Sequence, residues 1–284
     1  MTGLSTKSKL TIATLLNRVI LGGRAILGKP DQGVFTRNSI RYSLDLREGI
    51  DFAVYLSRYE RDLTKALERL LPSGGIAVDA GANVGIHTLA MTQVVGAKGK
   101  VFAFEPTCFA VEKLRNSLAL NPSLQGSVEV LHAFLAPEPG FEPPQEIFSS
   151  WPLGASDDVH PSHGGSLKET TGAVSIHLDS FLRERGVERL DLIKLDVDGH
   201  ELDVLKGASE SIDRFRPSVV VELCTEVAIE HGHTVSDILE FFLNRNYNFT
   251  FLDGREIGSD IEHILSLIPP GGGINVVAAP RSLS

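Results

Sequence analysis

Cysteine is scarce in this sequence, with only Cys108 and Cys224 among 284 residues. Scaffolds built on disulfides use far more, so we expect this chain in a reducing cytoplasm. Neither cysteine has a second one at CxxC spacing, and the nine histidines are scattered along the chain. These absences exclude a disulfide framework and a structural zinc site.

Positive charge is also in short supply. The 27 lysines and arginines are outnumbered by 36 aspartates and glutamates, which gives a formal net charge of −9. Because such a chain has no general attraction for phosphate, we expect no nucleic-acid partner. Residues 1–30 are the exception, since they hold five cations and no acidic residue.

Long apolar runs are missing from the N-terminal segment. Arg18 and Arg24 interrupt the stretch Leu10–Leu27, and Gly22-Gly23 breaks its helical pattern. These interruptions argue against a signal peptide and against a transmembrane helix. We expect an amphipathic helix that packs on the domain, on a second subunit or on a membrane surface, with packing on the domain favoured.

With 42% hydrophobic residues, the chain can bury one sizeable core. We interpret residues 1–72 as an N-terminal extension and residues 73–284 as one domain. In the extension, Ile40–Leu46 alternates apolar and polar residues as a half-buried strand does, for which we expect a hairpin, and Asp62–Leu71 has the pattern of a helix.

From residue 76 the chain alternates apolar runs with amphipathic ones. Buried parallel strands read as unbroken apolar runs, so this rhythm predicts an α/β fold with a seven-stranded, doubly wound sheet covered by helices on both faces. The predicted helices are Ile86–Val95, Phe109–Leu120, one near Glu201–Ile212 and one near Val235–Asn244. The predicted strands are Ile76–Ala80, Val101–Phe104, Val128–Leu135, Leu190–Leu195, Ser218–Leu223, Phe249–Leu252 and Ile274–Ala278.

The segment Pro137–Thr171 breaks this rhythm with six prolines and the lone Trp151. So long a loop inside a compact domain is usually a lid, a binding loop or an insertion. We favour a lid over the substrate, with a tolerated surface insertion as the alternative.

A glycine-rich turn, Val78–Gly85, follows the first predicted strand of the sheet. In an open α/β sheet such a turn faces the ligand crevice. The G-x-G-x-x-G pattern of dinucleotide sites is absent, because Asn83 and Ile86 stand where the second and third glycines belong. Asp79 would repel phosphate but suits the amino group of a methionine moiety, so the turn favours S-adenosylmethionine over NAD.

Glu105 ends the next predicted strand and is followed by Pro106. A carboxylate at this place can accept hydrogen bonds from both hydroxyls of a ribose. Farther along, the strand ending at Leu195 runs into an acidic turn, Asp196–Glu201, which also contains His200. Asp198 can be read as the N-cap of the following helix, whereas Asp196 is the better candidate for chemistry.

With these motifs in view, residues from about Leu44 to Ala278 resemble the FkbM family of methyltransferases. The resemblance rests on the stretch from Glu48 to Glu60, on VDAGANVG, FAFEP and LIKLDVDGHELDVLKGA, and on RPSVVVELC. It implies a class I methyltransferase (Rossmann-like) fold with S-adenosylmethionine as donor, and O-methylation of sugars, glycolipids or natural products. The family commonly has Glu where this chain has Asp198, and the proline-rich loop is idiosyncratic.

Carried onto this chain, the resemblance assigns the donor to two motifs and to Asp196 of the acidic turn. The predicted donor-binding residues are Asp79, Gly81, Ala82, Asn83, Gly85, Glu105, Pro106 and Asp196. Methyl transfer to a hydroxyl also needs a proton acceptor, for which Asp196 and His200 are the candidates, with His177 and His87 behind them. Some related O-methyltransferases bind a divalent cation such as Mg²⁺ at the places of Asp196 and Glu222, so metal dependence stays an alternative.

The sequence therefore predicts an S-adenosylmethionine-dependent O-methyltransferase acting on a small-molecule or glycan acceptor. Two alternatives share the sheet, namely an NAD-dependent oxidoreductase and a binding module that holds S-adenosylmethionine without catalysis.

Overall fold

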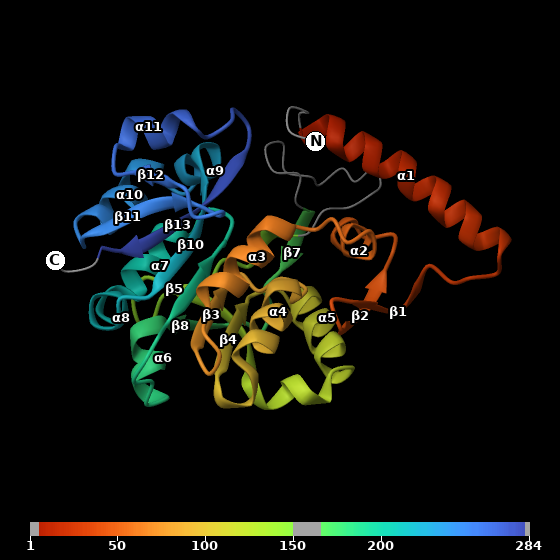
Figure 1. Cartoon of the computed structure of the whole chain (residues 1–284), viewed down its shortest axis with the longest axis horizontal. Coiled ribbons are helices and arrows are strands. Elements are labelled where there is room, and N and C mark those ends of the chain that lie inside the picture. The colour runs from red at the N-terminus through yellow and green to blue at the C-terminus, as the bar shows by residue number, and fades with distance from the viewer. Residues whose placement is uncertain (1–5, 150–165, 282–284) are drawn as a thin grey trace.

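A mixed β-sheet forms the centre of the computed structural model, which describes residues 6–149 and 166–281. Within these residues nine strands follow the order β12-β11-β13-β10-β9-β3-β4-β5-β8 (Figure 1). They are β3 (Ile76–Ala80), β4 (Lys100–Glu105), β5 (Val128–Ala136), β8 (Val174–His177), β9 (Leu192–Leu195), β10 (Ser218–Cys224), β11 (Tyr247–Phe251), β12 (Glu256–Gly258) and β13 (Gly273–Pro280).

All seven predicted strands are present, but the predicted number of strands is too low. The two additional strands, β8 and β12, lie at opposite edges of the sheet. They contain only four and three residues, Val174–His177 and Glu256–Gly258, so neither has an apolar run that periodicity could detect. Pairing with β5 and β11 makes them strands, and that pairing is a tertiary property.

Helices cover both faces of the sheet, as the alternating strand residues require. Val78 and Ala80 point into one core cluster, whereas Ala77 belongs to the other. The helices outside the extension are α4 (Ile86–Val95), α5 (Cys108–Ala119), α6 (Leu178–Glu184), α7 (Glu201–Gly207), α8 (Ser209–Phe215), α9 (Thr225–Glu230), α10 (Val235–Leu243) and α11 (Ile261–Ser266), with 3₁₀ turns at Gly96–Lys98 and Pro122–Ser127.

The helix expected near Glu201–Ile212 is two short helices, α7 and α8, which meet at Ala208. Gly207 ends the first one. A Cβ atom there would lie 2.2 Å from the carbonyl oxygen of Ala136, so the absent side chain lets α7 pack closely against the end of β5.

The extension consists of α1 (Thr6–Ile26), the hairpin β1 (Gln32–Arg37) and β2 (Ile40–Asp45), and the helices α2 (Gly49–Tyr55) and α3 (Arg61–Leu70). The hairpin and the helix predicted near Asp62–Leu71 are confirmed. The extension shares a core with the sheet, since Phe52 and Leu67 pack in the same cluster as Leu89 of α4. No described helix is long and apolar enough to cross a membrane.

Side chains of α5, together with Asn121 just beyond it, tie the hairpin and α2 to the domain. The amide of Ser43 donates to Ser117 Oγ at 3.2 Å, and Lys113 forms an ion pair with the buried Asp51. The backbone of Arg41 exchanges hydrogen bonds with the Asn121 side chain. The outer edge of β2 is thereby capped by side chains.

The described part of the segment Pro137–Thr171 contains a second hairpin, β6 (Glu146–Ser149) paired with β7 (Ser166–Glu169). Trp151 and the rest of residues 150–165 lie outside the described residues. The hairpin ends beside the ligand crevice described next, because Ile147 and Ser149 line its wall. This position is compatible with the predicted lid, whose movement stays a prediction.

The order of the strands determines where the ligand crevice lies in the sheet. From β3 the chain moves outward through β4, β5 and β8, and then returns to β9 on the other side of β3. The turns after β3 and β9 therefore diverge at the carboxyl ends of adjacent parallel strands, where open α/β sheets bind ligands.

Candidate functional site

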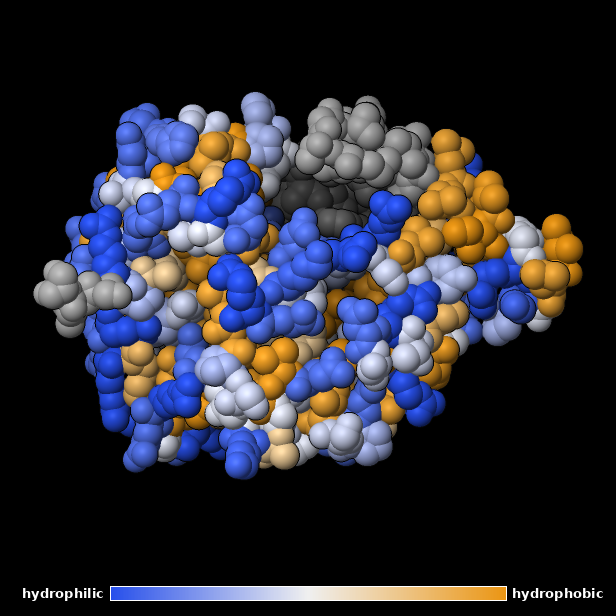
Figure 2. Space-filling model, in the orientation of Figure 1, coloured by the Kyte–Doolittle hydropathy of each residue, from blue (hydrophilic) through white to orange (hydrophobic). Residues whose placement is uncertain are grey.

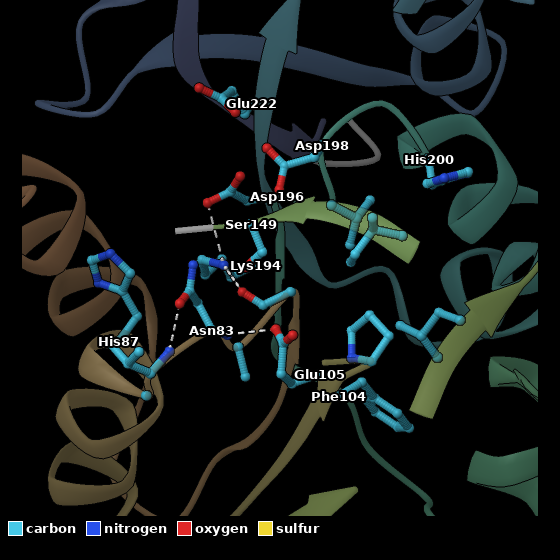
Figure 3. A pocket seen from close by; sticks show the side chains of 18 of the residues that line it. Asn83, His87, Phe104, Glu105, Ser149, Lys194, Asp196, Asp198, His200 and Glu222 are labelled. Atoms are coloured by element: carbon cyan, nitrogen blue, oxygen red, sulfur yellow. Dashed lines mark hydrogen bonds and ion pairs between the residues drawn. The ribbon is translucent and has the colours of Figure 1, made fainter. Parts of the chain in front are cut away.

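A pocket opens at this switch point, and Figure 3 shows its residues. Its walls come from the turns after β3, β4 and β9, from the strand ends of β5 and β10, and from the extension. The polar and charged residues among its lining are Tyr59, Glu60, Asn83, His87, Glu105, Ser149, Lys194, Asp196, Asp198, His200 and Glu222.

The glycine turn can take its shape only because its key positions carry no side chain. Gly81 has φ +76°, and a Cβ atom there would lie 1.8 Å from the carbonyl oxygen of Asp196. Gly85 has φ +87°, and a Cβ atom there would lie 2.1 Å from Leu114 Cδ1. The turn thus presses against β9 on one side and α5 on the other, and its residues from Gly81 to Gly85 line the pocket.

Glu105 lies at the end of β4 and is held by the turn that it faces. Its Oε2 accepts a hydrogen bond from the backbone N–H of Asn83 at 2.8 Å, and its Oε1 accepts from the amide and hydroxyl of Thr107. Only 3% of Glu105 is exposed, and burial raises the pKa of its carboxyl group. Glu105 and the adjacent Pro106 both line the pocket, as the donor-site prediction requires.

Asp79 occupies a different place from the one its predicted role needs. It is fully buried and is not among the residues that line the pocket. Its carboxylate accepts a hydrogen bond from Thr88 Oγ1 at 2.6 Å and lies 3.2 Å from the ammonium group of Lys194. Asp79 therefore lies behind the pocket wall. A residue that contacts the amino group of a donor directly would have to be one that lines the pocket.

Lys194 is a central charge of the site that sequence reasoning missed. Its Nζ donates to the carbonyl oxygen of Gly81 at 2.9 Å and lies 3.5 Å from Asp196 Oδ2. Burial disfavours its charge, but Asp79 and Asp196 outweigh burial and raise its pKa. A lysine inside the otherwise apolar LIKL strand was the available signal, because buried lysines are rare unless paired.

The acidic turn and strand β10 bring several carboxyl groups together at the upper wall of the pocket, where Figure 3 shows Asp196, Asp198 and Glu222. Burial, followed by repulsion from Asp196 and other acids, raises the pKa values of Asp198 and Glu222 well above the ordinary carboxyl range. Glu201 Oε1 folds back to accept hydrogen bonds from the amides of Val197 and Gly199. The Glu201 side chain thus closes the turn through hydrogen bonds to its backbone amides.

The interpretation of Asp198 as a helix N-cap is wrong. Helix α7 begins at Glu201, its N-cap residue is His200, and no side chain forms a capping hydrogen bond there. Asp198 instead has φ +49°, a left-handed conformation that Asp tolerates better than most residues. That conformation turns its carboxyl group toward the pocket, which the residue lines.

The pair predicted to bind a metal, Asp196 and Glu222, does line the same pocket. Among the described residues, however, no group of three or more potential ligands is arranged to hold a metal ion. Lys194 also faces one carboxylate oxygen of Asp196. The structure gives no support to the predicted divalent cation.

Three histidines were named as candidate proton acceptors, and they lie in different surroundings. His200 lines the pocket with its Nδ1 3.5 Å from Asp203 Oδ2, and its ring packs edge-on against Phe134. His87 also lines the pocket. His177 instead caps helix α6 and is not among the lining residues.

Glu60 is the second site residue that sequence reasoning left without a role. It lies at the start of α3 in the extension, and its Oε2 is 2.8 Å from His87 Nε2. The other ring nitrogen of His87 lies 3.3 Å from Thr64 Oγ1. Only the fold brings the extension to the helix after the glycine turn, so the sequence carried little signal for this pair.

Comparisons with known proteins identify several sequences that are similar to this chain. The sequence model of the Methyltransferase FkbM domain matches residues 79–249. The methyltransferase sdnD of Sordaria araneosa is 35% identical over 179 residues, which cover 54% of this chain and 67% of that protein. The hexuronic acid methyltransferase AglP of Haloferax volcanii is 29% identical over 169 residues, which cover 58% and 63%.

A further relative is the 2-O-methyltransferase NoeI of Sinorhizobium fredii, 25% identical over 214 residues that cover 65% of this chain and 79% of that protein. Among solved structures, methyltransferase FkbM from Methylobacillus flagellatus is 17% identical with a TM-score of 0.43, and covers 72% of this chain and 44% of that chain. The matched region spans about two thirds of the first two relatives' lengths.

Proposed function

We propose, from the premise that this chain belongs to the FkbM family of methyltransferases, that it methylates a hydroxyl group of a sugar, glycolipid or natural-product acceptor. The observation that carries the proposal is Glu105, a buried carboxylate held by the backbone of the glycine turn at the switch point of the sheet. S-Adenosylmethionine is the methyl donor of this family of enzymes.

The residues of the pocket fit the donor. Glu105 has carboxylate oxygens with remaining acceptor capacity and faces a pocket in which a ribose with two hydroxyls can be bound. Asn83, in the left-handed conformation, is fixed by Glu105 and turns its own side-chain oxygen back to the amide of Val84. Ala82 and Pro106 complete this wall. When bound, the donor supplies an electrophilic methyl group on a sulfonium.

The acceptor is proposed from the relatives' names and from the chain's charge. Two relatives are named for a hexuronic acid and for 2-O-methylation, which supports a sugar hydroxyl as the methylated group. The net charge of −9 argues against a nucleic-acid acceptor. Ile147 and Ser149 of the insertion line the pocket, so we place contacts with the acceptor there.

The chain must also remove a proton from the acceptor's hydroxyl group while the new carbon–oxygen bond forms. Asp196 and His200 remain the proposed acceptors of that proton. Lys194 Nζ lies 3.5 Å from Asp196 Oδ2 and holds this carboxylate in place at the pocket wall. Asp203 similarly lies beside His200 Nδ1, and would orient the ring so that Nε2 is the basic nitrogen.

Family membership makes the NAD-dependent oxidoreductase an unsupported alternative. Whether the enzyme depends on a metal held by Asp196 and Glu222 can be tested separately. Incubation with a chelator should abolish turnover, and an added divalent cation should restore it, only if a metal is required.

The function is tested with purified protein, S-adenosylmethionine labelled at its methyl group, and a panel of free sugars, uronic acids and glycolipids. Labelled product, with the label located on oxygen by mass spectrometry, is the expected result. Glu105→Ala should bind the donor more weakly in the same preparation. Transfer to nitrogen or carbon only would contradict the proposed O-methylation, and transfer to no member of the panel would contradict the proposed acceptor class.

A further inference from the structure

Glu60 reaches the donor pocket from the N-terminal extension, and its backbone is unusual. Its φ of +31° and ψ of +47° place a non-glycine residue in the left-handed region. Such a conformation costs about 1–3 kcal/mol and persists where surrounding contacts impose it, often at functional sites. Here it directs the side chain into the pocket wall, where 30% of that side chain is exposed.

The surroundings of Glu60 keep its carboxylate ionised. Burial opposes the charge, but the hydrogen bond to His87 and the charges of His87 and Lys194 hold the pKa of Glu60 below its ordinary value. His87 is itself only 4% exposed, and the ring of Tyr59 packs against it at 5.6 Å. A fixed, partly exposed anion in a pocket wall is suited to a cationic ligand group.

The position of Glu60 relative to Glu105 suggests which cationic group. Figure 3 shows His87, the partner of Glu60, on the opposite side of Asn83 from Glu105. If Glu105 holds the ribose, the methionine portion of the donor extends along the glycine turn toward His87. Asp79, the residue first expected to meet the amino group, is fully buried and paired with Lys194.

We infer that Glu60, positioned by His87, binds the α-ammonium group of the donor's methionine portion. The inference rests on the proposed function in that S-adenosylmethionine is the donor. It makes the N-terminal extension part of the donor site, although the sequence motifs that predict this site all lie farther along the chain. Glu60 takes no part in proton removal from the acceptor.

The test is a calorimetric comparison of three ligands that differ in their amino-acid portion. S-Adenosylmethionine and S-adenosylhomocysteine carry the α-ammonium group, whereas 5′-methylthioadenosine lacks the amino-acid portion. Glu60→Gln should weaken the first two about 10- to 100-fold, the worth of a hydrogen bond to a charged group, and change the third less than about twofold. Asp62→Asn, on the exposed surface of the same helix, is the matched control and should change none.

Equal loss for all three ligands, or no loss for any, would overturn the role of Glu60. If Glu60→Gln does not fold, Glu60→Asp keeps the charge and should show the same ligand pattern with a smaller loss. Because binding is measured without an acceptor, failure of this inference leaves the proposed O-methylation standing. Failure of all donor binding by the parent protein would instead contradict the donor itself.

A second, independent observation concerns helix α1. Its outward surface is apolar, as the orange area at the upper right of Figure 2 shows, and it lies at the outer edge of the molecule in Figure 1. Positions 15, 19 and 26 repeat at helical spacing and form one stripe. The exposed apolar residues of this surface are Leu15 (57%), Leu16 (43%), Val19 (72%), Ile26 (88%) and Leu27 (69%).

Contacts on the inner side of α1 orient the helix so that its apolar surface faces solvent. Asn17, only 6% exposed, donates its side-chain amide to the carbonyl oxygen of Leu46 at 2.6 Å. The guanidinium of Arg24 lies over the rings of Phe35 and Tyr55 at 5.5 and 5.9 Å. Packing on the domain is therefore satisfied by one side of the helix and leaves the apolar stripe uncovered within the described chain.

The charge of the N-terminal segment indicates which kind of partner fits the apolar surface of α1. Residues 1–30 contain Lys7, Lys9, Arg18, Arg24 and Lys29 without an acidic residue, so the formal charge of −9 becomes −14 once these five are set aside. Two copies of α1 facing each other would bring like charges together. An anionic lipid surface offers both an apolar layer and opposite charge, worth about 1 kcal/mol for each cation near the surface, although Arg24 packs inward on Phe35 and Tyr55 and is not one of these.

We propose that α1 docks the protein on anionic lipid surfaces. Sedimentation with vesicles should show binding to phosphatidylcholine mixed with phosphatidylserine, and much weaker binding to phosphatidylcholine alone. The combined changes Leu15→Ser, Val19→Ser and Ile26→Ser should abolish binding. Ile229→Ser, which alters a residue 60% exposed on α9, should leave it unchanged.

Failure of the parent to sediment with anionic vesicles would overturn this proposal, as would retained binding by the triple variant. Analytical ultracentrifugation of the same proteins adds an independent readout. A dimer of the parent that the triple variant cannot form would assign the stripe to a second copy of the chain instead.

Discussion

Lys194→Met should be among the most destabilising single changes in this protein. Lys194 is 2% exposed, and its Nζ lies 3.2 Å from Asp79 Oδ1 and 3.5 Å from Asp196 Oδ2. Methionine has a similar length but no charge. Asp79 would then keep its hydrogen bond from Thr88 but would be a buried carboxylate without a counter-ion. Removing one partner of a buried pair costs about 3–5 kcal/mol of unfolding free energy.

The measurement is urea-induced unfolding followed by circular dichroism. The variant should lower the midpoint at an unchanged dependence on urea concentration. The double variant Asp79→Asn, Lys194→Met should recover about half of the loss or more, because the fully buried carboxylate at position 79 is then gone and only the partly exposed Asp196 has lost its cation. Lys206→Met is the control, since Lys206 is 55% exposed and its ion pair with Asp203 at 3.6 Å should contribute about 0–1 kcal/mol.

Two results would refute this reasoning. A loss below about 1 kcal/mol for Lys194→Met would mean that Asp79 is neutralised or solvated without the lysine. A double variant no more stable than the single one would mean that Lys194 acts through its hydrogen bonds to the carbonyl oxygens of Ala80 and Gly81, and not through the charge of Asp79.

Three further predictions concern the pocket. Glu105→Gln should weaken S-adenosylmethionine and 5′-methylthioadenosine alike, by about 10-fold or more in calorimetry, because both carry the ribose; loss for only one of them would contradict a ribose contact. His200→Ala should lower kcat about 10²- to 10⁴-fold with donor affinity nearly unchanged if His200 takes the acceptor's proton, and a small change in kcat would exclude it. Asp198→Asn should stabilise the protein near neutral pH: the raised pKa means that the folded chain holds this proton more tightly than the unfolded chain, so the parent loses stability as pH rises above about 4, whereas the variant does not. Urea unfolding from pH 4 to pH 8 should therefore show a difference that grows with pH, and a constant difference would contradict the cause given.

Much of the site could be predicted because its residues follow strands. The glycine turn comes directly after β3 and Glu105 ends β4, and carboxyl ends of parallel strands meet at one edge of a sheet. Gly81, Asn83 and Gly85 accordingly line the pocket with Glu105. A local motif of this kind predicts both the secondary-structure element and the edge of the sheet at which its residues lie.

The misplaced and missing residues have a common cause. Asp79 belongs to the same motif, but its side chain points to the buried Lys194 and not to the crevice, a direction that depends on β9 lying beside β3. Glu60 and His87 are separated by 27 residues and meet only because α3 packs against α4. Motif spacing contains no information on such contacts.

The sequence by itself determined the alternation of strands and helices, the absence of a dinucleotide turn, and the acids that end β4 and β9, because each depends on periodicity or on neighbouring residues. Only the tertiary structure decided which carboxylates are exposed in the pocket and which are buried and paired with Lys194. Asp79 is fully buried 3.2 Å from Lys194, whereas the Glu60 side chain is 30% exposed at the pocket, and both situations arise from packing between segments far apart in the chain.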